Sequence, residues 1–409
     1  MKIFLTALIA LIGMMNVACA AEVVDDEPAR NLSTSVNEFC WKYFATLDHS
    51  FNCVYSPYGI HVALSILANG ATGDTRTEIL HALEVDNVEN LNDGHENFLA
   101  TVEKNYRGEN FFGSANLFLV NKKISGRGLE KNFRRTMTDV YKADVRTADF
   151  AGNVKAERKK ISEFVNEQTN NFIPDYSPMV DANTLTDLLN VVYFKGNWKF
   201  PFDKRFTENQ DFTNCDGTKF RIEMMQKTFD EKIAYFADEK FRGIKLPYTT
   251  GAVMFLILPA DENALNVSEL WINESTTYRE NFLDALKKTP PFDGKVVVRM
   301  PNVGMEFDNS LNECFWKLGI KKAFTDDAEF FNVVNDTQLK ISQANQRARI
   351  DINERGTIAA AVTEITMVGA TAVPEPPKII HFDADRPFIF VIRDLESNVT
   401  LFAGATNHF

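Results

Sequence analysis

The sequence predicts an α+β fold in a single large domain, because helical patterns dominate its first half and strand patterns its second. The helical signal is apolar residues spaced three and four apart, and the strand signal is short apolar, β-branched runs between turn residues. The chain has 409 residues, of which 45% are hydrophobic and 24% charged, a composition that allows a large core. No long linker, internal repeat or low-complexity tract divides it.

Two segments carry the clearest helical pattern. One begins at Gly73-Asp74-Thr75 and runs to Leu83, with Asp74 placed to cap it. The other, residues 155–172, has apolar residues at helical spacing and stops before Pro174, which cannot continue a helix.

The later part of the chain contains the strand patterns. Leu188 to Phe194 is apolar and β-branched, which is typical of a central strand. Phe241 to Pro259 holds two apolar runs separated by Tyr248-Thr249-Thr250-Gly251, which indicates a hairpin. Further strands are predicted at Lys295 to Met300, Gln338 to Asn353, Pro387 to Asp394 and Val399 to Ala405.

The N-terminus has the features of a secretory signal peptide. Lys2 gives a positive start, Ile3 to Met15 is apolar, and Ala18-Cys19-Ala20 offers the small residues that a signal peptidase needs. The apolar run is too short to span ~30 Å of hydrocarbon. We therefore expect residues 1–20 to be removed and residues 21–409 to be secreted as one domain.

The net charge of the protein limits the classes of partner that it can bind. The formal net charge of −12 becomes −13 when Lys2 is removed, which argues against nucleic acid as a partner. No later segment is long and apolar enough to cross a membrane; the best candidate, Val253 to Leu258, is a buried strand.

Cysteines and sequons agree with an extracellular protein. The mature chain keeps Cys40, Cys53, Cys215 and Cys314, without a C-x-x-C pair, so we expect no metal. An oxidising compartment permits disulfides, with Cys40 and Cys53 the nearest pair, but free buried thiols fit equally well. Five N-x-S/T sequons are candidates for glycosylation: Asn31, Asn266, Asn273, Asn335 and Asn398.

The segment from Glu354 to Val373 has an unusual composition. Between Thr357 and Val373 the only charged residue is Glu364. Because successive side chains of a strand point to opposite faces, the uncharged odd-numbered residues could face a core while Glu364 points away. The first four odd-numbered residues are small: Thr357, Ala359, Ala361 and Thr363.

The same segment could be an ordinary buried strand or an Ala-rich helix. However, Pro374, Pro376 and Pro377 follow directly and enforce an extended exit. The segment is also a long nonpolar connection between two predicted strands, and such connections tend to be functional.

At this point the sequence resembles the serpin family of serine protease inhibitors. Asn353-Glu354-Arg355-Gly356-Thr357 followed by Ala359-Ala360-Ala361 is similar to the hinge of the reactive-centre loop of inhibitory members. The run from Phe382 to Phe390 resembles the family signature after that loop, and Asn190 to Trp198 resembles the central strand beside the insertion site. These matches occur in family order, from about Val36 to the C-terminus.

The resemblance implies a serpin fold of three β-sheets and eight or nine helices, with an exposed reactive-centre loop at about residues 354–377. It also implies a suicide-substrate mechanism without catalysis by the inhibitor. A serine protease attacks the loop and forms an acyl-enzyme, and the cut loop then inserts into the central sheet and traps the protease covalently. No cofactor is implied, and the inhibitor acts as a monomer.

The family pattern also assigns roles to single residues. The implied hinge consists of Glu354, Arg355, Gly356, Thr357, Ala359, Ala360, Ala361 and Thr363. Counting from the hinge glutamate puts the reactive bond at Ala370–Thr371, and a shift of one residue would move it to Gly369–Ala370. A small residue at the bond suits an elastase-like protease rather than a trypsin-like one, and Met367 could also attract a chymotrypsin- or elastase-like enzyme.

The implied sheet-opening region consists of Ser56, Asn190, Trp198 and Gln346. Here the chain departs from the common pattern. Gln346 stands where many members have histidine, and Gly59 replaces a usual serine near Ser56. We interpret both departures as adjustments of sheet opening.

Two other interpretations remain open. Basic residues at Lys122, Lys123, Arg127, Lys131, Arg134 and Arg135, and at Lys155, Arg158, Lys159 and Lys160, could bind a polyanion weakly or form solvated helix faces. A non-inhibitory serpin, acting as a carrier, storage protein or chaperone, is the alternative function. The small hinge residues favour inhibition, and the absence of G-x-S-x-G and H-E-x-x-H motifs argues against a hydrolase.

Overall fold

The computed structural model describes residues 27–107, 110–125, 128–335, 338–357 and 377–409, without the side chains of residues 27–31. These residues form three β-sheets and nine α-helices, which confirms the predicted α+β fold.

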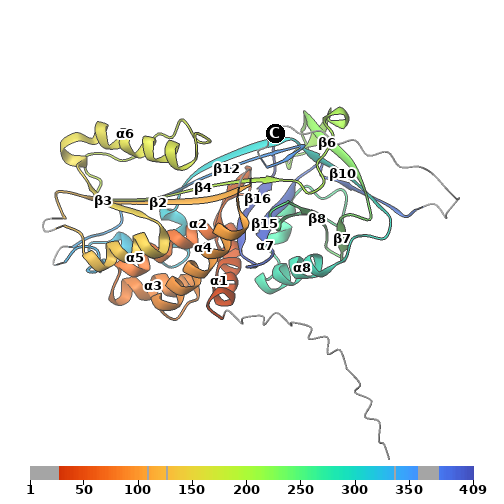
Figure 1. Ribbon diagram of the computed structural model, residues 1–409. Coiled ribbons are helices and arrows are strands. Elements are labelled where there is room, and N and C mark those ends of the chain that lie inside the picture. The colour runs from red at the N-terminus through yellow and green to blue at the C-terminus, as the bar shows by residue number, and fades with distance from the viewer. Residues whose placement is uncertain (1–26, 108–109, 126–127, 336–337, 358–376) are drawn as a thin grey trace, which may run out of the picture.

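A central sheet of six strands runs through the molecule (Figure 1). Its strands, in spatial order, are β11 (Val303–Ser310), β12 (Gln343–Asn353), β13 (Gly356–Thr357), β4 (Thr186–Asn197), β2 (Phe111–Asn121) and β3 (Asp144–Ala148). The predicted central strand therefore lies in the middle of the largest structural layer.

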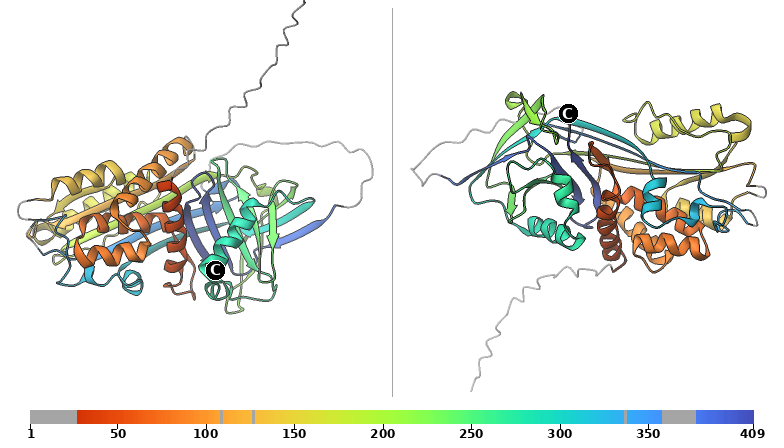
Figure 2. Two further views of the ribbon diagram at one scale, coloured as in Figure 1. Left: turned by 90° about the horizontal axis from the view of Figure 1, so that it is seen from below. Right: turned by 180° about the vertical axis from the view of Figure 1, so that it is seen from behind.

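Two further sheets gather beyond one end of the central sheet. The second sheet has the order β1 (Cys53–Tyr55), β16 (Thr400–Thr406), β15 (Phe388–Asp394), β9 (Ala252–Pro259), β8 (Phe241–Pro247) and β7 (Ala234–Ala237). The third sheet has the order β14 (Ile379–Asp383), β10 (Lys295–Pro301), β6 (Lys219–Asp230) and β5 (Glu208–Thr213). In both views of Figure 2 the green strands lie at one end of the molecule and the orange helices at the other.

Helices cover both faces of the central sheet. Figure 1 shows α6 alone on one face and α2 to α5 on the other. The nine helices of the described chain are α1 (Glu27–Phe44), α2 (Pro57–Gly70), α3 (Gly73–Leu83), α4 (Val88–Asn105), α5 (Lys131–Tyr141), α6 (Phe150–Gln168), α7 (Val267–Ile272), α8 (Thr276–Lys288) and α9 (Asn312–Lys317). Two short 3-10 helices follow the same chain order: η1 (Lys204–Phe206) and η2 (Lys322–Phe324).

Strand β4 contributes to a core on each side. Leu189 and Val191 pack under α6 in a small core, whereas Leu188, Val192 and Phe194 point into the main core on the opposite face. This alternation follows from the two-residue period of a strand. The even-numbered side chains of β4 therefore face α2, which begins under the middle of the sheet.

The start of α2 is fixed by its sequence. Ser56 is the N-cap, its hydroxyl accepts a 3.0 Å hydrogen bond from the Gly59 amide, and Pro57 is the first helical residue, where a missing N–H costs nothing. Nearly every side chain of α2 is buried.

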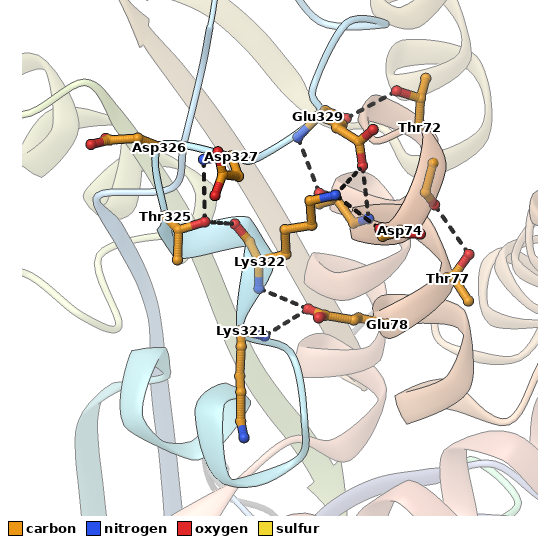
Figure 3. Close-up of polar contacts among 12 residues, drawn as sticks. Thr72, Asp74, Thr77, Glu78, Lys321, Lys322, Thr325, Asp326, Asp327 and Glu329 are labelled. Carbon is orange, nitrogen blue, oxygen red and sulfur yellow. Dashed lines mark hydrogen bonds and ion pairs between the residues drawn. The ribbon is translucent and has the colours of Figure 1, made fainter.

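The predicted role of Asp74 as the cap of α3 is wrong, because Thr72 is the N-cap residue and its side chain makes no capping bond. Asp74 instead forms a 3.0 Å ion pair with Lys322, whose ammonium also pairs with Glu329 at 2.9 Å (Figure 3). The carboxylate of Glu78 accepts two backbone N–H bonds from the same segment, so the start of α3 is tied to residues 321–329.

Most strand predictions are confirmed. The hairpin of residues 241–259 is β8 and β9, and the strand predicted from Gln338 begins only at Gln343. In the described part of the chain all four cysteines are free thiols, and no helix combines the length and apolarity needed to cross a membrane. The same residues contain no group of three or more His, Cys, Asp or Glu side chains that could hold a metal ion.

Candidate functional site

The two-residue strand β13 lies between β12 and β4 at one end of the central sheet. Gly356 and Thr357 pair antiparallel with Asn353 and Ile352 on one side, and Thr357 lies opposite Gly196 on the other. Two residues of the predicted hinge thus already occupy a position between the two central strands.

Beyond β13, strands β12 and β4 pair directly with each other and run parallel. This pairing extends from Gln343 opposite Asp187 to Arg349 opposite Tyr193, and we call it the seam. A strand that continued β13 along the sheet would have to open the seam.

Gly356 is required where β13 enters the sheet. Its φ is +149°, and a Cβ atom there would lie 2.0 Å from the carbonyl oxygen of Gly196 and 2.8 Å from Cα of Asn197. Because both clashes are with backbone, no side-chain movement could relieve them, and only glycine fits.

Thr357 anchors the other end of β13 in the core. Its side chain is fully buried, and its hydroxyl oxygen lies 2.9 Å from that of Tyr248. Burial raises the pKa of Tyr248 well above its ordinary value, so the phenol stays neutral. The Tyr248 ring stacks on Trp198, with centroids 4.3 Å apart and planes tilted by 14°.

Trp198 and Glu354 hold the turn that precedes β13. The indole N–H of Trp198 donates a 2.9 Å bond to the carbonyl of Asn353, and its amide donates a 2.7 Å bond to the carbonyl of Arg355. The Glu354 carboxylate is buried and accepts a 2.7 Å bond from the Thr207 hydroxyl. Its charge is therefore held by a side chain from outside the sheet.

Ser56, Asn190 and Gln346 meet at the middle of the seam. Gln346 Oε1 accepts a 2.9 Å bond from the Ser56 amide, and Gln346 Nε2 donates a 2.7 Å bond to Asn190 Oδ1. Asn190 Nδ2 in turn donates to Asn116 Oδ1 at 2.8 Å. Trp198, the fourth residue predicted for sheet opening, lies instead with the hinge at the end of the sheet.

Gly59 and Gln346 fit each other. A Cβ atom at position 59 would lie 2.3 Å from Asn190 Oδ1, 2.5 Å from a Val192 methyl and 2.9 Å from Gln346 Nε2. The two departures noted in the sequence are therefore in contact, and the space left by glycine holds the two amide side chains.

Asp187 is a buried acid at the far end of the seam that the sequence analysis did not single out. Its side chain is 2% exposed, and burial raises its pKa to about 7, opposed only by a 3.5 Å hydrogen bond from Asn345. Its place between Thr186 and two leucines in a buried strand was the available signal. Tyr248 and Thr207 were also missed, because their partners lie more than 100 residues away along the chain.

The remaining predicted hinge and bond residues lie outside the described residues: Ala359, Ala360, Ala361, Thr363, Ala370 and Thr371. Their roles stay predictions.

The sequons differ in exposure. Asn266, Asn273 and Asn335 are exposed, and the side chain of Asn31 is not described. Asn398 is half-buried, and its Oδ1 accepts a 2.6 Å bond from Lys287. Asn398 is therefore the least accessible of the four that can be compared.

Arg127 lies outside the described residues, and the other residues of the predicted polyanion sites fall on and around α5 and α6. Lys122, Lys123 and Lys131 are exposed, whereas Lys159 and Lys160 form ion pairs with carboxylates of their own helix. These pairs reduce the charge that α6 could offer to a partner.

Comparisons with known proteins agree with this geometry. The family model described as Serpin (serine protease inhibitor) matches residues 34–408. Iripin-1 from Ixodes ricinus is 30% identical over 96% of this chain and 97% of its own length. The native structure of the thermophilic serpin tengpin superposes with a TM-score of 0.81 at 24% identity and covers 94% of this chain and 95% of its own. The structure of human thyroxine-binding globulin in complex with thyroxine superposes with a TM-score of 0.80 at 23% identity. It covers 92% of this chain and 98% of its own. The chain belongs to the serpin family and has its fold.

Proposed function

We propose that this protein is a secreted serine protease inhibitor that acts as a suicide substrate through insertion of residues 358 onward into the seam. The observation that carries the proposal is β13, which starts such a strand between β12 and β4. The strands of the seam are in direct contact beyond it, so the inserted state differs from the described one by added strand pairing.

The register of β13 can be continued residue by residue. Each further residue would advance one position along both neighbours. The odd-numbered residues would then lie between the following pairs: Ala359 between Ile350 and Phe194, Ala361 between Ala348 and Val192, and Thr363 between Gln346 and Asn190.

These positions explain why small residues are needed. Ile350, Phe194, Ala348 and Val192 are at most 1% exposed and belong to the main core. A bulky side chain inserted among them would overpack the core, and a charge would be desolvated without a partner. Thr357, which already occupies this face, is small and finds its hydrogen bond in the core.

In this proposal the protease supplies the chemistry. Its serine attacks the carbonyl of Ala370, or of Gly369 if the bond is shifted by one residue, and the amine of the next residue leaves. Insertion then competes with hydrolysis of the acyl-enzyme. Insertion must also release free energy that the native state holds, so the native protein is kinetically rather than thermodynamically stable. The small residue at the bond favours an elastase-like target.

Secretion, glycosylation and the monomeric state of the inhibitor are part of the same proposal. The signal-peptide pattern of residues 1–20 supports secretion, and the exposed side chains of Asn266, Asn273 and Asn335 support glycosylation. We expect a monomer with no cofactor.

The test is incubation with elastase, chymotrypsin and trypsin, followed by denaturing gels and mass spectrometry of the fragments. A band near the summed mass of both proteins that survives boiling in detergent is expected with at least one protease. The released C-terminal peptide would identify the reactive bond. If the proteases cleave the loop but none of them forms such a band, inhibition is rejected in favour of a non-inhibitory serpin.

A further inference from the structure

Three lysines lie around Phe200 and Pro201, near the end of the central sheet. The Nζ atoms of Lys199 and Lys232 lie 5.7 and 5.4 Å from the centroid of the Phe200 ring. Lys227 Nζ donates a 2.8 Å bond to the carbonyl of Pro201, the next residue. We call Lys199, Lys227 and Lys232 the lysine triad.

The positive charge of the triad is only partly balanced by its surroundings. Across the described residues, none of the three lysines forms an ion pair, although the protein has a net charge of −12. The nearby carboxylate of Asp203 is held by Arg205 through two 3.0 Å bonds. Burial lowers the pKa of Lys227 and the charge of Lys232 lowers it further, whereas the charge of Asp203 opposes both effects. The charges of Lys227 and Lys232 therefore repel each other in the free protein.

The triad lies between the two points where segment 358–376 joins the described structure. On one side the amide of Phe202 donates a 2.7 Å bond to the carbonyl of Glu354, just before the segment. On the other side Glu231 bonds to Gly294 at 3.1 Å, and the amide of the adjacent Lys295 bonds to the carbonyl of Lys378 at 2.8 Å, just after the segment. The lysines therefore lie beside the residues at which the segment leaves and rejoins the described structure.

We propose that the lysine triad is a docking surface for acidic residues of the target protease. This proposal rests on the proposed inhibitory function. It adds a surface by which the inhibitor would distinguish one protease from another. Exposed carboxylates at Asp230, Glu231 and Asp293 flank the triad and would repel an extended polyanion, whereas a protease can present its acids locally. Lysines that pair with a partner mainly accelerate encounter, and the acceleration falls with ionic strength.

The test compares two triple variants. Lys199→Gln/Lys227→Gln/Lys232→Gln removes the triad, and Lys122→Gln/Lys123→Gln/Lys131→Gln removes three exposed lysines elsewhere. The probe is the protease of the panel that forms the detergent-resistant complex fastest, as isolated and after succinylation of its surface lysines. Succinylation makes the protease more acidic, and active-site titration corrects for any lost activity. The readout is the second-order rate constant of inhibition at low and high salt.

We expect the unmodified inhibitor to react faster with the succinylated protease at low salt, by about tenfold. The triad variant should lose this preference and its salt dependence, while the stoichiometry of inhibition stays the same. The control variant should keep both. An equal preference in the triad variant would overturn the docking surface. Absence of any complex with the unmodified inhibitor would instead reject the proposed function.

Discussion

Gln346 Nε2 donates a 2.7 Å hydrogen bond to Asn190 Oδ1 directly across the seam between β12 and β4. Both side chains are at most 2% exposed, so neither can turn to water when this bond breaks. A strand that enters the seam must separate them and leave two buried amides that need new partners. The continued register of β13 brings Thr363 between them.

We therefore predict that Thr363→Val lowers the stability of the cleaved, inserted form. The hydroxyl of threonine can bond to the separated amides, whereas valine of similar shape cannot, which should cost about 1–3 kcal/mol. The measurement is the melting temperature of the protein after loop cleavage. Thr366→Val is the matched control, because position 366 falls on the opposite face of the inserted strand.

A cleaved Thr363→Val protein that melts with the cleaved wild type would contradict this register. Equal losses from both substitutions would argue that neither hydroxyl is specifically placed.

Gly59→Ala should weaken the closed seam. The added Cβ would lie 2.3 Å from Asn190 Oδ1 and 2.5 Å from a Val192 methyl, so the amide pair must shift. We expect the uncleaved protein to lose about 1–3 kcal/mol of stability, as is typical of overpacking. Thermal unfolding of the uncleaved protein measures this. Gly217→Ala, where no atom lies within 4 Å of the added Cβ, controls for loss of glycine, although its φ of +83° adds backbone strain.

If Gly59→Ala proved as stable as the wild type, the contact between Gly59 and the amide pair would not matter for sheet closure.

The sequence predicted those parts of the protein that depend on local patterns. The strand at residues 188–194 was visible from its apolar run, and the hairpin at 241–259 from its turn residues. The start of α3 was misjudged because Asp74 pairs with Lys322, 248 residues away, instead of capping its own helix. A local capping rule cannot anticipate such a distant partner.

The candidate site was predictable only in part, for the same reason. Ser56, Asn190 and Gln346 were singled out by family resemblance, but their hydrogen bonds appear only once three distant segments meet. Tyr248 and Thr207 carried no sequence signal, because a tyrosine in a hairpin turn and a threonine before a strand are ordinary. The lysine triad also comes from separate segments, so no run of basic residues in the sequence indicated it.

Ala359→Arg should convert the inhibitor into a substrate. Its side chain would enter the main core between Ile350 and Phe194, where an unpaired charge stalls insertion until the acyl-enzyme is hydrolysed. Ile358→Arg is the matched control, since the same change one residue earlier points to the other face. The readout is the stoichiometry of inhibition, which should rise several-fold for Ala359→Arg only.

Equal stoichiometries of inhibition for the two arginine variants would contradict the prediction that odd-numbered residues of the inserted strand face the main core.

The buried pair His61 and His95 should make the protein acid-labile. Both are fully buried, with His61 Nδ1 3.2 Å from His95 Nε2 and His61 Nε2 2.8 Å from the Ser35 hydroxyl. Burial lowers the pKa of His61 to about 3, and burial together with His61 lowers that of His95. Because the unfolded chain binds these protons near pH 6.5 and the folded chain does not, their contribution to stability is complete above pH 6.5 and is lost as the pH falls toward 3.

His95→Gln should therefore reduce the fall in melting temperature between pH 7 and pH 4.5, while the exposed His81→Gln should leave it unchanged. A His95→Gln protein that loses as much stability over this range as the wild type would assign the acid lability to other groups.

Asp187 should make the protein less stable as the pH rises, which is opposite to the effect of the two histidines. Burial raises its pKa from 3.8 to about 7, so the folded protein holds a proton that the unfolded chain has released. Its contribution to stability is complete below pH 3.8 and is lost as the pH rises through 7. Asp187→Asn removes this loss while keeping an oxygen to accept the bond from Asn345. We expect equal melting temperatures at pH 4 and a gain on the order of 2 kcal/mol for the variant at pH 8, whereas the exposed Asp175→Asn should show no such trend. A difference in stability between Asp187→Asn and wild type that stays constant from pH 4 to pH 8 would mean that Asp187 does not titrate in this range.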